Sequence, residues 1–164
     1  MSPPAPFTIH SLAPDDVALL RALLTVFGEA FGEVETYGGA RPSAGYLERL
    51  LASDSFMALA ALKSGEVVGG IAAYELRKFE QERSEIYIYD LAVAAAHRRE
   101  GIATALILEL RRIAAARGAY AIFVQADRGD APAIALYTKL GTAEDACTSI
   151  YEILVSFLKR SAPS

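Results

Sequence analysis

The sequence predicts one mixed α/β (α+β) domain, in which a mostly antiparallel sheet contains a central parallel strand pair and is flanked by helices. Apolar runs over 56–62 and 67–74 are separated by a Lys-Ser-Gly-Glu turn, which is the pattern of an antiparallel hairpin. A strand-forming run over 85–93 precedes a helical pattern over 101–117 and another strand-forming run over 120–126. Strand, helix and strand in that order favour a parallel pair.

The N-terminal elements follow from proline, glycine and helical spacing. Residues 1–6 are rich in proline, so we expect a flexible N-terminus, and residues 7–11 form a first strand. Residues 14–16, Pro-Asp-Asp, open a helix whose apolar stripe consists of Val17, Leu20, Leu24 and Phe27. Two glycines loosen its end, and we predict a loop over 33–43 and a short helix over 46–51.

The C-terminal elements complete a single domain. Proline in a tolerated first turn predicts a helix that begins at 130–132 and ends at Gly141. A final strand is expected over 148–155, and residues 159–164 form a polar tail. The predicted order is β-α-α-β-β-β-α-β-α-β, with residues 7–158 as one domain.

Composition excludes several classes of function. The net charge of -4 is wrong for a protein that coats nucleic acid. The single cysteine, Cys147, precludes an internal disulfide, and His10 and His97 lie too far apart in sequence to indicate a zinc site. The chain begins without a signal-peptide pattern and has no apolar stretch long enough for a membrane span. We therefore expect a cytoplasmic protein with no metal, nucleic-acid or membrane partner.

A phosphate-binding pattern, Arg98-x-x-Gly101-x-Ala103, stands at the junction between a predicted strand and a predicted helix. The first N–H groups of a helix have no internal partner and can bind phosphate oxygens. Small residues at 101 and 103 allow close approach, and Arg98 and Arg99 add positive charge. The alternative interpretation is a basic turn before an amphipathic helix.

A second candidate for the site, Tyr137, lies about thirty residues after the phosphate-binding pattern, in a predicted helix. Ala133, Leu136, Tyr137 and Leu140 share one helical face. An inward-facing tyrosine near a cleft can protonate a departing thiolate. The alternative interpretation is a core tyrosine whose hydroxyl is satisfied locally.

Together, Leu91-Ala92-Val93, Arg98-x-x-Gly101-x-Ala103 and Ala135-Leu136-Tyr137-x-Lys139-Leu140-Gly141 resemble the GNAT acetyltransferase superfamily. The resemblance implies acetyl-CoA as co-substrate, pyrophosphate at 98–104, pantetheine paired with the backbone at Leu91 and Val93, and Tyr137 as the acid. The implied cofactor-binding residues are Leu91, Ala92, Val93, Arg98, Arg99, Glu100, Gly101, Ile102, Ala103, Thr104, Asp130, Ala133 and Tyr137. Departures from common family residues are Ala95 for proline, Arg99 and Ala103 for glycine, and Asp130 for asparagine, although Asp130 can still cap its helix.

Longer segments over 27–37, 78–81, 84–93 and 124–130 resemble the small GNAT-type aminoglycoside 3-N-acetyltransferases. The resemblance implies acetylation of the 3-amino group on the deoxystreptamine ring of gentamicin-like antibiotics, and hence antibiotic resistance. Members of the family often form dimers, so the resemblance also suggests a homodimer through the apolar C-terminal strand.

A polycationic acceptor requires carboxylates. Glu29 and Glu33 would share a helix face if the first helix continued that far. The candidate acceptor-binding residues are Glu29, Glu33, Glu35, Tyr37, Glu80, Asp127 and Asp130. For each acid the alternative is an ordinary solvated surface charge.

Asp90 is the favoured base for the acceptor ammonium, with Glu85 and Asp127 as rivals. Strand alternation places Asp90 with Ile86 and Ile88 on an apolar face, where a carboxylate is costly unless it is paired or used. A β-bulge would change this assignment. The expected reaction is direct transfer within a ternary complex.

Two other functions remain compatible with the sequence. The first is acetylation of another amine, such as a polyamine or a protein N-terminus. The second is a non-catalytic acyl-CoA-binding module, which the presence of Tyr137 and the candidate carboxylates argues against.

Overall fold

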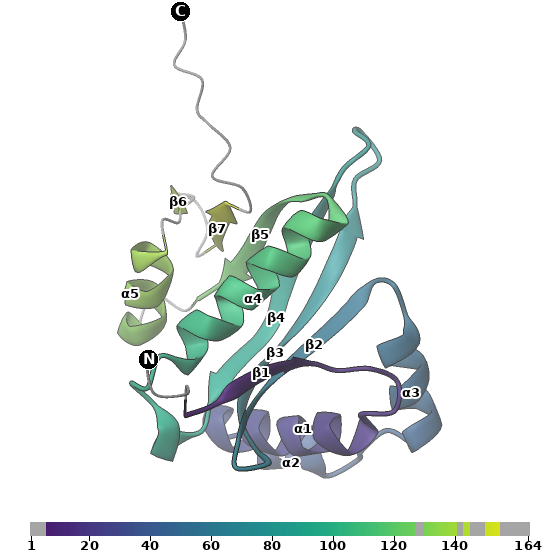
Figure 1. Ribbon diagram of the computed structural model, residues 1–164, viewed down its shortest axis with the longest axis vertical. Helices are drawn as coiled ribbons and strands as arrows, with labels where there is room; N and C mark the ends of the chain where they lie inside the picture. Colours follow the sequence, from purple (N-terminus) through teal and green to yellow (C-terminus); the bar gives the residue numbers. More distant parts are fainter. Residues whose placement is uncertain (1–5, 127–129, 141–142, 145–149, 155–164) are drawn as a thin grey trace, which may run out of the picture.

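The computed structural model describes residues 6–126, 130–140, 143–144 and 150–154. Seven strands form one sheet in the order β1-β2-β3-β4-β5-β7-β6 (Figure 1). The strands are β1 (Thr8–Ser11), β2 (Phe56–Lys63), β3 (Glu66–Arg77), β4 (Ser84–Val93), β5 (Ala119–Gln125), β6 (Ala143–Glu144) and β7 (Ile150–Leu154). Only β4 and β5 pair in parallel among these strands. The predicted fold class is confirmed.

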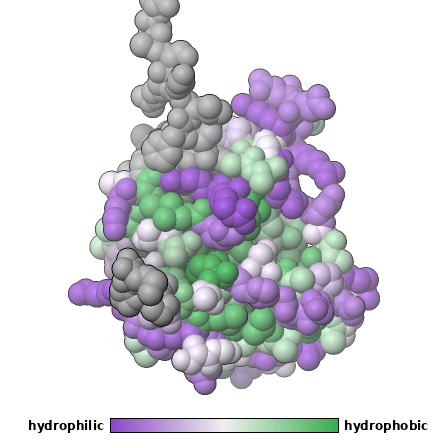
Figure 2. All heavy atoms as spheres, in the orientation of Figure 1, coloured by the Kyte–Doolittle hydropathy of each residue, from purple (hydrophilic) through white to green (hydrophobic). Residues whose placement is uncertain are grey.

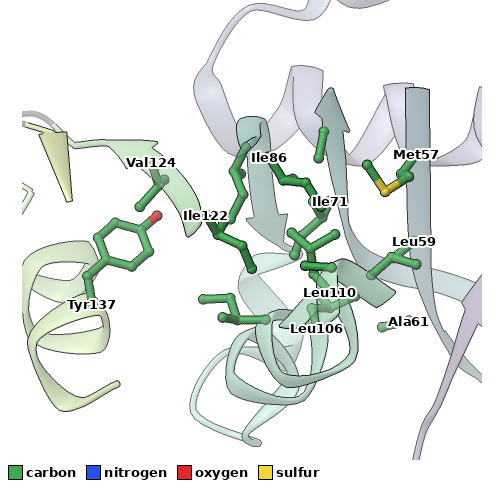
Figure 3. Packing of buried hydrophobic residues seen from close by; sticks show 14 of the residues in the cluster. Met57, Leu59, Ala61, Ile71, Ile86, Leu106, Leu110, Ile122, Val124 and Tyr137 are labelled. Atoms are coloured by element: carbon green, nitrogen blue, oxygen red, sulfur yellow. The ribbon is translucent and has the colours of Figure 1, made fainter. Parts of the chain in front are cut away.

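The helices lie on both faces of the sheet (Figure 1). They are α1 (Val17–Phe31), α2 (Val34–Gly38), α3 (Ala44–Ala52), α4 (Ile102–Arg117) and α5 (Ala131–Lys139), with a 3-10 turn η1 (Ala95–His97) before α4. One core cluster joins the sheet to α4 and α5, and a second joins it to α1 and α3. The α4-side cluster is seen from close by in Figure 3.

Strand β2 shows how one sequence serves both cores. Its residues alternate along the strand, with Met57 and Leu59 in the α4-side cluster and Ala58 and Ala60 in the α1-side cluster. A strand that is apolar on both faces needs a helix layer on each side. The unbroken apolar run from Phe56 reflects that double burial.

The segment predicted as a loop over 33–43 contains the short helix α2, so that prediction is wrong in part. Helix α1 ends at Gly32, whose left-handed φ of 66° breaks the helix before Glu33. Glu33 is instead the N-cap position of α2. Glu29 and Glu33 therefore do not extend one continuous helix, and the condition for their sharing a face is not met.

The predicted facing of Asp90 is also wrong, because β4 contains a β-bulge. Ala72 of β3 pairs with Asp90 and Ala73 pairs with Ile88, which leaves Tyr89 as the extra residue. An extra residue reverses the alternation beyond it. Ile88 lies in the α4-side core, whereas Asp90 contacts Tyr37, which packs against the α1-side core.

Candidate active site

The parallel strands β4 and β5 separate partway along their length. Their pairing runs from Ser84 and Ala119 to Ile88 and Val124, but β4 continues to Val93. Over the described residues, this last part of β4 has a strand partner on its β3 side only. The separation leaves an open β4 edge in the middle of the sheet.

Hydrogen-bond alternation identifies the backbone groups on that edge. The N–H of Ala94 donates to the carbonyl of Val68 at 2.8 Å, so Ala94 bonds toward β3. In an antiparallel ladder such bonds involve alternate residues, which directs the backbone groups of Leu91 and Val93 toward the opening. The Val93 carbonyl accepts from Arg98 Nε at 3.4 Å, in agreement with this direction. An extended chain can therefore pair with β4 at Leu91 and Val93.

The N-terminus of α4 lies beyond the end of this edge. Its N-cap is Gly101, with a φ of 82° and no side-chain cap. The first helical bond runs from the Ala105 N–H to the Gly101 carbonyl at 3.0 Å, so the N–H groups of Ile102, Ala103 and Thr104 precede it. A Cβ at Gly101 would meet no atom within 4 Å, so the approach to these groups is open. This geometry fits a pyrophosphate.

The side chains around this turn differ in how far they are available to a bound phosphate. Arg98 and Arg99 are exposed, and Arg99 adopts a left-handed φ of 65°, a conformation that favours glycine. The carboxylate of Glu100 is bound by Lys63 at 3.0 Å, so only its backbone is available to a phosphate. Ile102 is buried and anchors the helix in the core.

Tyr137 extends from α5 toward Val124, the residue at which β5 leaves β4, with its hydroxyl on the strand side (Figure 3). The side chain is buried, and burial together with the negative charge of Asp130 raises the pKa of Tyr137 to about 12. The phenol therefore stays protonated at neutral pH and is able to donate a proton. Asp130 is the N-cap of α5 and accepts from the Ala133 N–H at 3.1 Å, as its capping role predicts.

Asp90 faces the opposite side of the sheet. It accepts a hydrogen bond from the Tyr37 hydroxyl at 3.0 Å. Burial raises the pKa of Asp90, the bond from Tyr37 lowers it, and the charge of nearby Glu33 raises it again. Tyr37 is thus in contact with Asp90, and the charge of Glu33 is near enough to act on the same carboxylate.

Aromatic side chains border this carboxylate, and sequence analysis did not single them out. Tyr89, the bulge residue, is 65% exposed and makes an edge contact with Tyr74 at 6.0 Å between ring centroids. Tyr74 packs in turn on Phe56. The two tyrosines at 87 and 89 are visible in the sequence as a possible aromatic surface. The contact between Tyr89 and Tyr74, however, depends on the strand register.

Glu80 and Glu85 lie elsewhere, at the β3–β4 hairpin. Lys78 Nζ contacts Glu80 at 3.1 Å and Glu85 at 3.6 Å, and the Tyr120 hydroxyl donates to Glu85 at 3.0 Å. The hairpin projects from the sheet in Figure 1, and its tip is hydrophilic in Figure 2. These carboxylates are neutralised within a hairpin network five residues or more from Asp90 along the chain.

The other predicted acids are not gathered at Asp90. Glu29 is exposed in the last turn of α1, and Glu35 is exposed in the first turn of α2. Asp127 lies outside the described residues. Within the described part of the chain, no cluster of three or more His, Cys, Asp or Glu residues could hold a metal ion, and no helix is long and apolar enough to span a membrane.

An open parallel strand pair, a helix N-terminus without a side-chain cap and a protonated buried tyrosine are features that fit an acyl-CoA-dependent acyltransferase. The chain belongs to the acetyltransferase (GNAT) family, whose model matches residues 20–142. It is therefore an N-acetyltransferase, and its fold is one that uses acetyl-CoA.

Solved structures include similar aminoglycoside acetyltransferases. HMB0005, from an uncultured soil metagenomic sample, is 64% identical, with a TM-score of 0.82 over 88% of this chain and 94% of that chain. Meta-AAC0020, also from an uncultured soil metagenomic sample and solved in complex with sisomicin, is 30% identical, with a TM-score of 0.75 over 82% and 86%.

A ribosomal-protein-alanine N-acetyltransferase from Brucella melitensis biovar Abortus 2308 is 27% identical, with a TM-score of 0.66 over 85% of this chain and 93% of that chain. No curated protein sequence matches this chain significantly. The resemblance to the GNAT superfamily is confirmed.

The two ends of α4 provide a matched test of the phosphate site. Gly101 and Gly118 both have positive φ, and a Cβ at either would meet no atom within 4 Å. We expect Gly101→Ala and Gly118→Ala each to lower the free energy of unfolding by about 1 kcal/mol, because alanine is strained there. Only Gly101→Ala should also weaken acetyl-CoA binding, by roughly tenfold, since its methyl group crowds the phosphate.

Calorimetric titration with acetyl-CoA and urea unfolding measure the two effects separately. Equal losses of affinity in both variants, or none in either, would remove Gly101 from the phosphate site.

Proposed function

We propose that this chain transfers an acetyl group from acetyl-CoA to the 3-amino group on the deoxystreptamine ring of gentamicin-like aminoglycosides, and thereby confers resistance to them. The observation that carries the proposal is the 64% identity to an aminoglycoside acetyltransferase over 88% of this chain. The position of the acetylated amine rests on the resemblance of segments such as 84–93 to 3-N-acetyltransferases.

The acceptor side has the chemistry that such a substrate needs. Aminoglycosides are polycations, and Asp90 and Glu33 supply negative charge beside the open β4 edge. Tyr74 and Tyr89 supply aromatic surface next to them. Carboxylates beside aromatic rings suit a cationic sugar, whose ammonium groups need charge and whose ring faces are partly apolar.

The donor side is proposed to use the backbone as its main ligand. Acetyl-CoA supplies an acetyl group activated as a thioester. Leu91 and Val93 pair with the pantetheine arm, and the N–H groups from Ile102 to Thr104, together with Arg98, hold the pyrophosphate. Ala92, Arg99, Glu100, Asp130 and Ala133 remain candidate donor-side contacts.

Proton handling is assigned to two side chains. Asp90, directly or through a water, takes a proton from the acceptor ammonium. The amine nitrogen then bonds to the acetyl carbon as the carbon–sulfur bond breaks, and it releases its second proton to solvent as the amide forms. A backbone N–H of the Leu91–Val93 segment polarises the carbonyl. Tyr137 gives its proton to the departing sulfur. Glu85 is the weaker candidate for the base, since Lys78 and Tyr120 already bind it.

A thiol-release assay across several amines tests the acceptor. We expect release with gentamicin-like compounds to exceed release with spermidine or with an N-terminal alanine peptide, because only the former offers a rigid array of ammonium groups. The peptide is the second candidate, since a ribosomal-protein-alanine N-acetyltransferase is among the similar structures.

Mass spectrometry and NMR of the product locate the acetylated nitrogen. Preference for the peptide, or acetylation at another ring position, would contradict the assignment. Acetyl-CoA binding without release for any amine would indicate a binding module.

Tyr137→Phe keeps the buried ring and removes the acid. We expect kcat to fall by roughly 100-fold, with acetyl-CoA affinity unchanged within about twofold, because the proton is needed only as sulfur leaves. A donor with a more acidic leaving thiol should narrow the gap. Steady-state kinetics with both donors provides the measurement, and unchanged kcat would exclude Tyr137 as the acid.

Asp90→Asn removes the proposed base without changing its size. We expect kcat/KM for the acceptor to fall by 100-fold or more at neutral pH, where the acceptor amine is mostly protonated. The reason is that general-base catalysis typically contributes a rate factor of about 10² to 10⁴. The deficit should shrink at alkaline pH, where free amine exists without a base. A pH–rate profile for Asp90→Asn that parallels the wild type would count against Asp90 as the base. Glu85→Gln is measured in the same way, and a larger loss of kcat/KM in that variant would favour Glu85 as the base.

A further inference from the structure

A single hydrogen bond connects the N-terminal helices to the proposed base. Tyr37 lies on α2 and its hydroxyl donates to Asp90 Oδ2 on β4 at 3.0 Å, across 53 residues of sequence. Tyr37 is partly buried, and burial and the bond to Asp90 both raise the pKa of its hydroxyl. The phenol therefore remains a hydrogen-bond donor throughout the working pH range.

Packing holds Tyr37 in this position. Its ring makes an edge contact with Phe27 at 6.1 Å and a tilted contact with Phe31 at 5.8 Å between centroids. Gly28 lets α2 close onto α1, because a Cβ there would lie 3.1 Å from the Tyr37 Cβ. The Glu33 N–H donates to the Gly28 carbonyl at 2.8 Å and fixes the turn. An aromatic ring packed against two other rings has a restricted orientation, so its hydroxyl can orient a partner.

We propose that Tyr37 is a positioning residue for the reaction: its hydroxyl holds Asp90 Oδ2, so that the carboxylate presents Oδ1 to the acceptor ammonium. The proposal rests on the proposed role of Asp90 as the base. It assigns the α1–α2 turn to the proton-handling machinery, and it gives the Tyr37 hydroxyl a role through Asp90 in place of direct contact with the acceptor.

The groups around Asp90 determine how this bond affects pH dependence. Tyr37 and Glu33 face it from the α2 side, Tyr74 faces it from β3 and Tyr89 neighbours it on β4, while α1 contributes apolar rings to the same cluster. Burial and Glu33 raise the pKa of Asp90, and the Tyr37 bond opposes them. Removing the hydroxyl therefore raises the pKa of Asp90, and the base becomes protonated at a higher pH.

Tyr37→Phe removes the hydroxyl and keeps the ring packed on Phe27 and Phe31. We expect the acid limb of the kcat/KM profile to move up by about one pH unit, so that activity falls roughly tenfold below the limb and less at high pH. Acetyl-CoA affinity should stay within about twofold of the wild type.

The matched control is Tyr120→Phe. Tyr120 also donates to a carboxylate at 3.0 Å, but to Glu85 in the hairpin network. Its loss should leave the acid limb in place. A shift in Tyr120→Phe and none in Tyr37→Phe would overturn the proposal and favour Glu85 as the base.

A double-mutant cycle separates this proposal from the one on which it rests. With Asp90→Asn as background, Tyr37→Phe should cost no further activity, because the carboxylate that it positions is gone. An equal loss in both backgrounds would show a merely structural role for Tyr37 and leave Asp90 as the base. Wild-type activity in Asp90→Asn alone would instead overturn the base assignment.

Replacing Tyr37 with 3-fluorotyrosine covers the case in which Tyr37→Phe does not fold. The more acidic phenol strengthens the bond to Asp90, so the acid limb should move down by a few tenths of a pH unit. An unchanged limb in the fluorinated enzyme would overturn the proposal.

Discussion

One extra residue in β4, Tyr89, determines the geometry on which the rest of the site depends. Without this bulge, Asp90 would follow Ile86 and Ile88 into the α4-side core, where an unpaired carboxylate costs far more than the roughly 2 to 7 kcal/mol of an unpaired neutral polar group. With it, Asp90 turns toward α1 and α2. The strand beyond the bulge also parts from β5, since their pairing ends at Ile88. The change in the facing of Asp90 and the open edge thus begin at the same place in β4.

The two proposed proton-handling groups consequently lie on opposite faces of the sheet. Tyr137 belongs to the α4-side core, and Asp90 contacts the α1-side residue Tyr37. Burial raises the pKa of both groups. Tyr137 thereby remains protonated, whereas Asp90, starting from a much lower pKa and assisted by Tyr37, stays available as a base. Separate environments keep the acid and base roles distinct, and the strand opening is the place at which both can act on one substrate.

The elements that carry the proposed donor half could be predicted from sequence because their signals are local. Strand, turn and helix signals over 85–117 identify the junction at Gly101, and proline and Asp130 identify the start of α5. The acceptor half depends on tertiary structure. Ile86, Ile88 and Asp90 alternate regularly, so nothing in the sequence marked the bulge. The glycines and acids around α2 are typical of a loop, but Tyr37 packs this short segment against the rings of Phe27 and Phe31 on α1. Such packing can stabilise a helix that its own propensity would not.

This contrast explains how one family can serve different acceptors. The donor site proposed here is contiguous, from Leu91 to Thr104, and relies on backbone groups that tolerate side-chain change. The proposed acceptor side is assembled from the turn before Tyr37, from Tyr74 on β3 and from the bulge at Tyr89. Substitutions in the α1–α2 turn can therefore alter charge and shape around Asp90 without disturbing the phosphate site. The fold is shared with a ribosomal-protein-alanine N-acetyltransferase at 27% identity, and a shared fold does not by itself determine the acceptor.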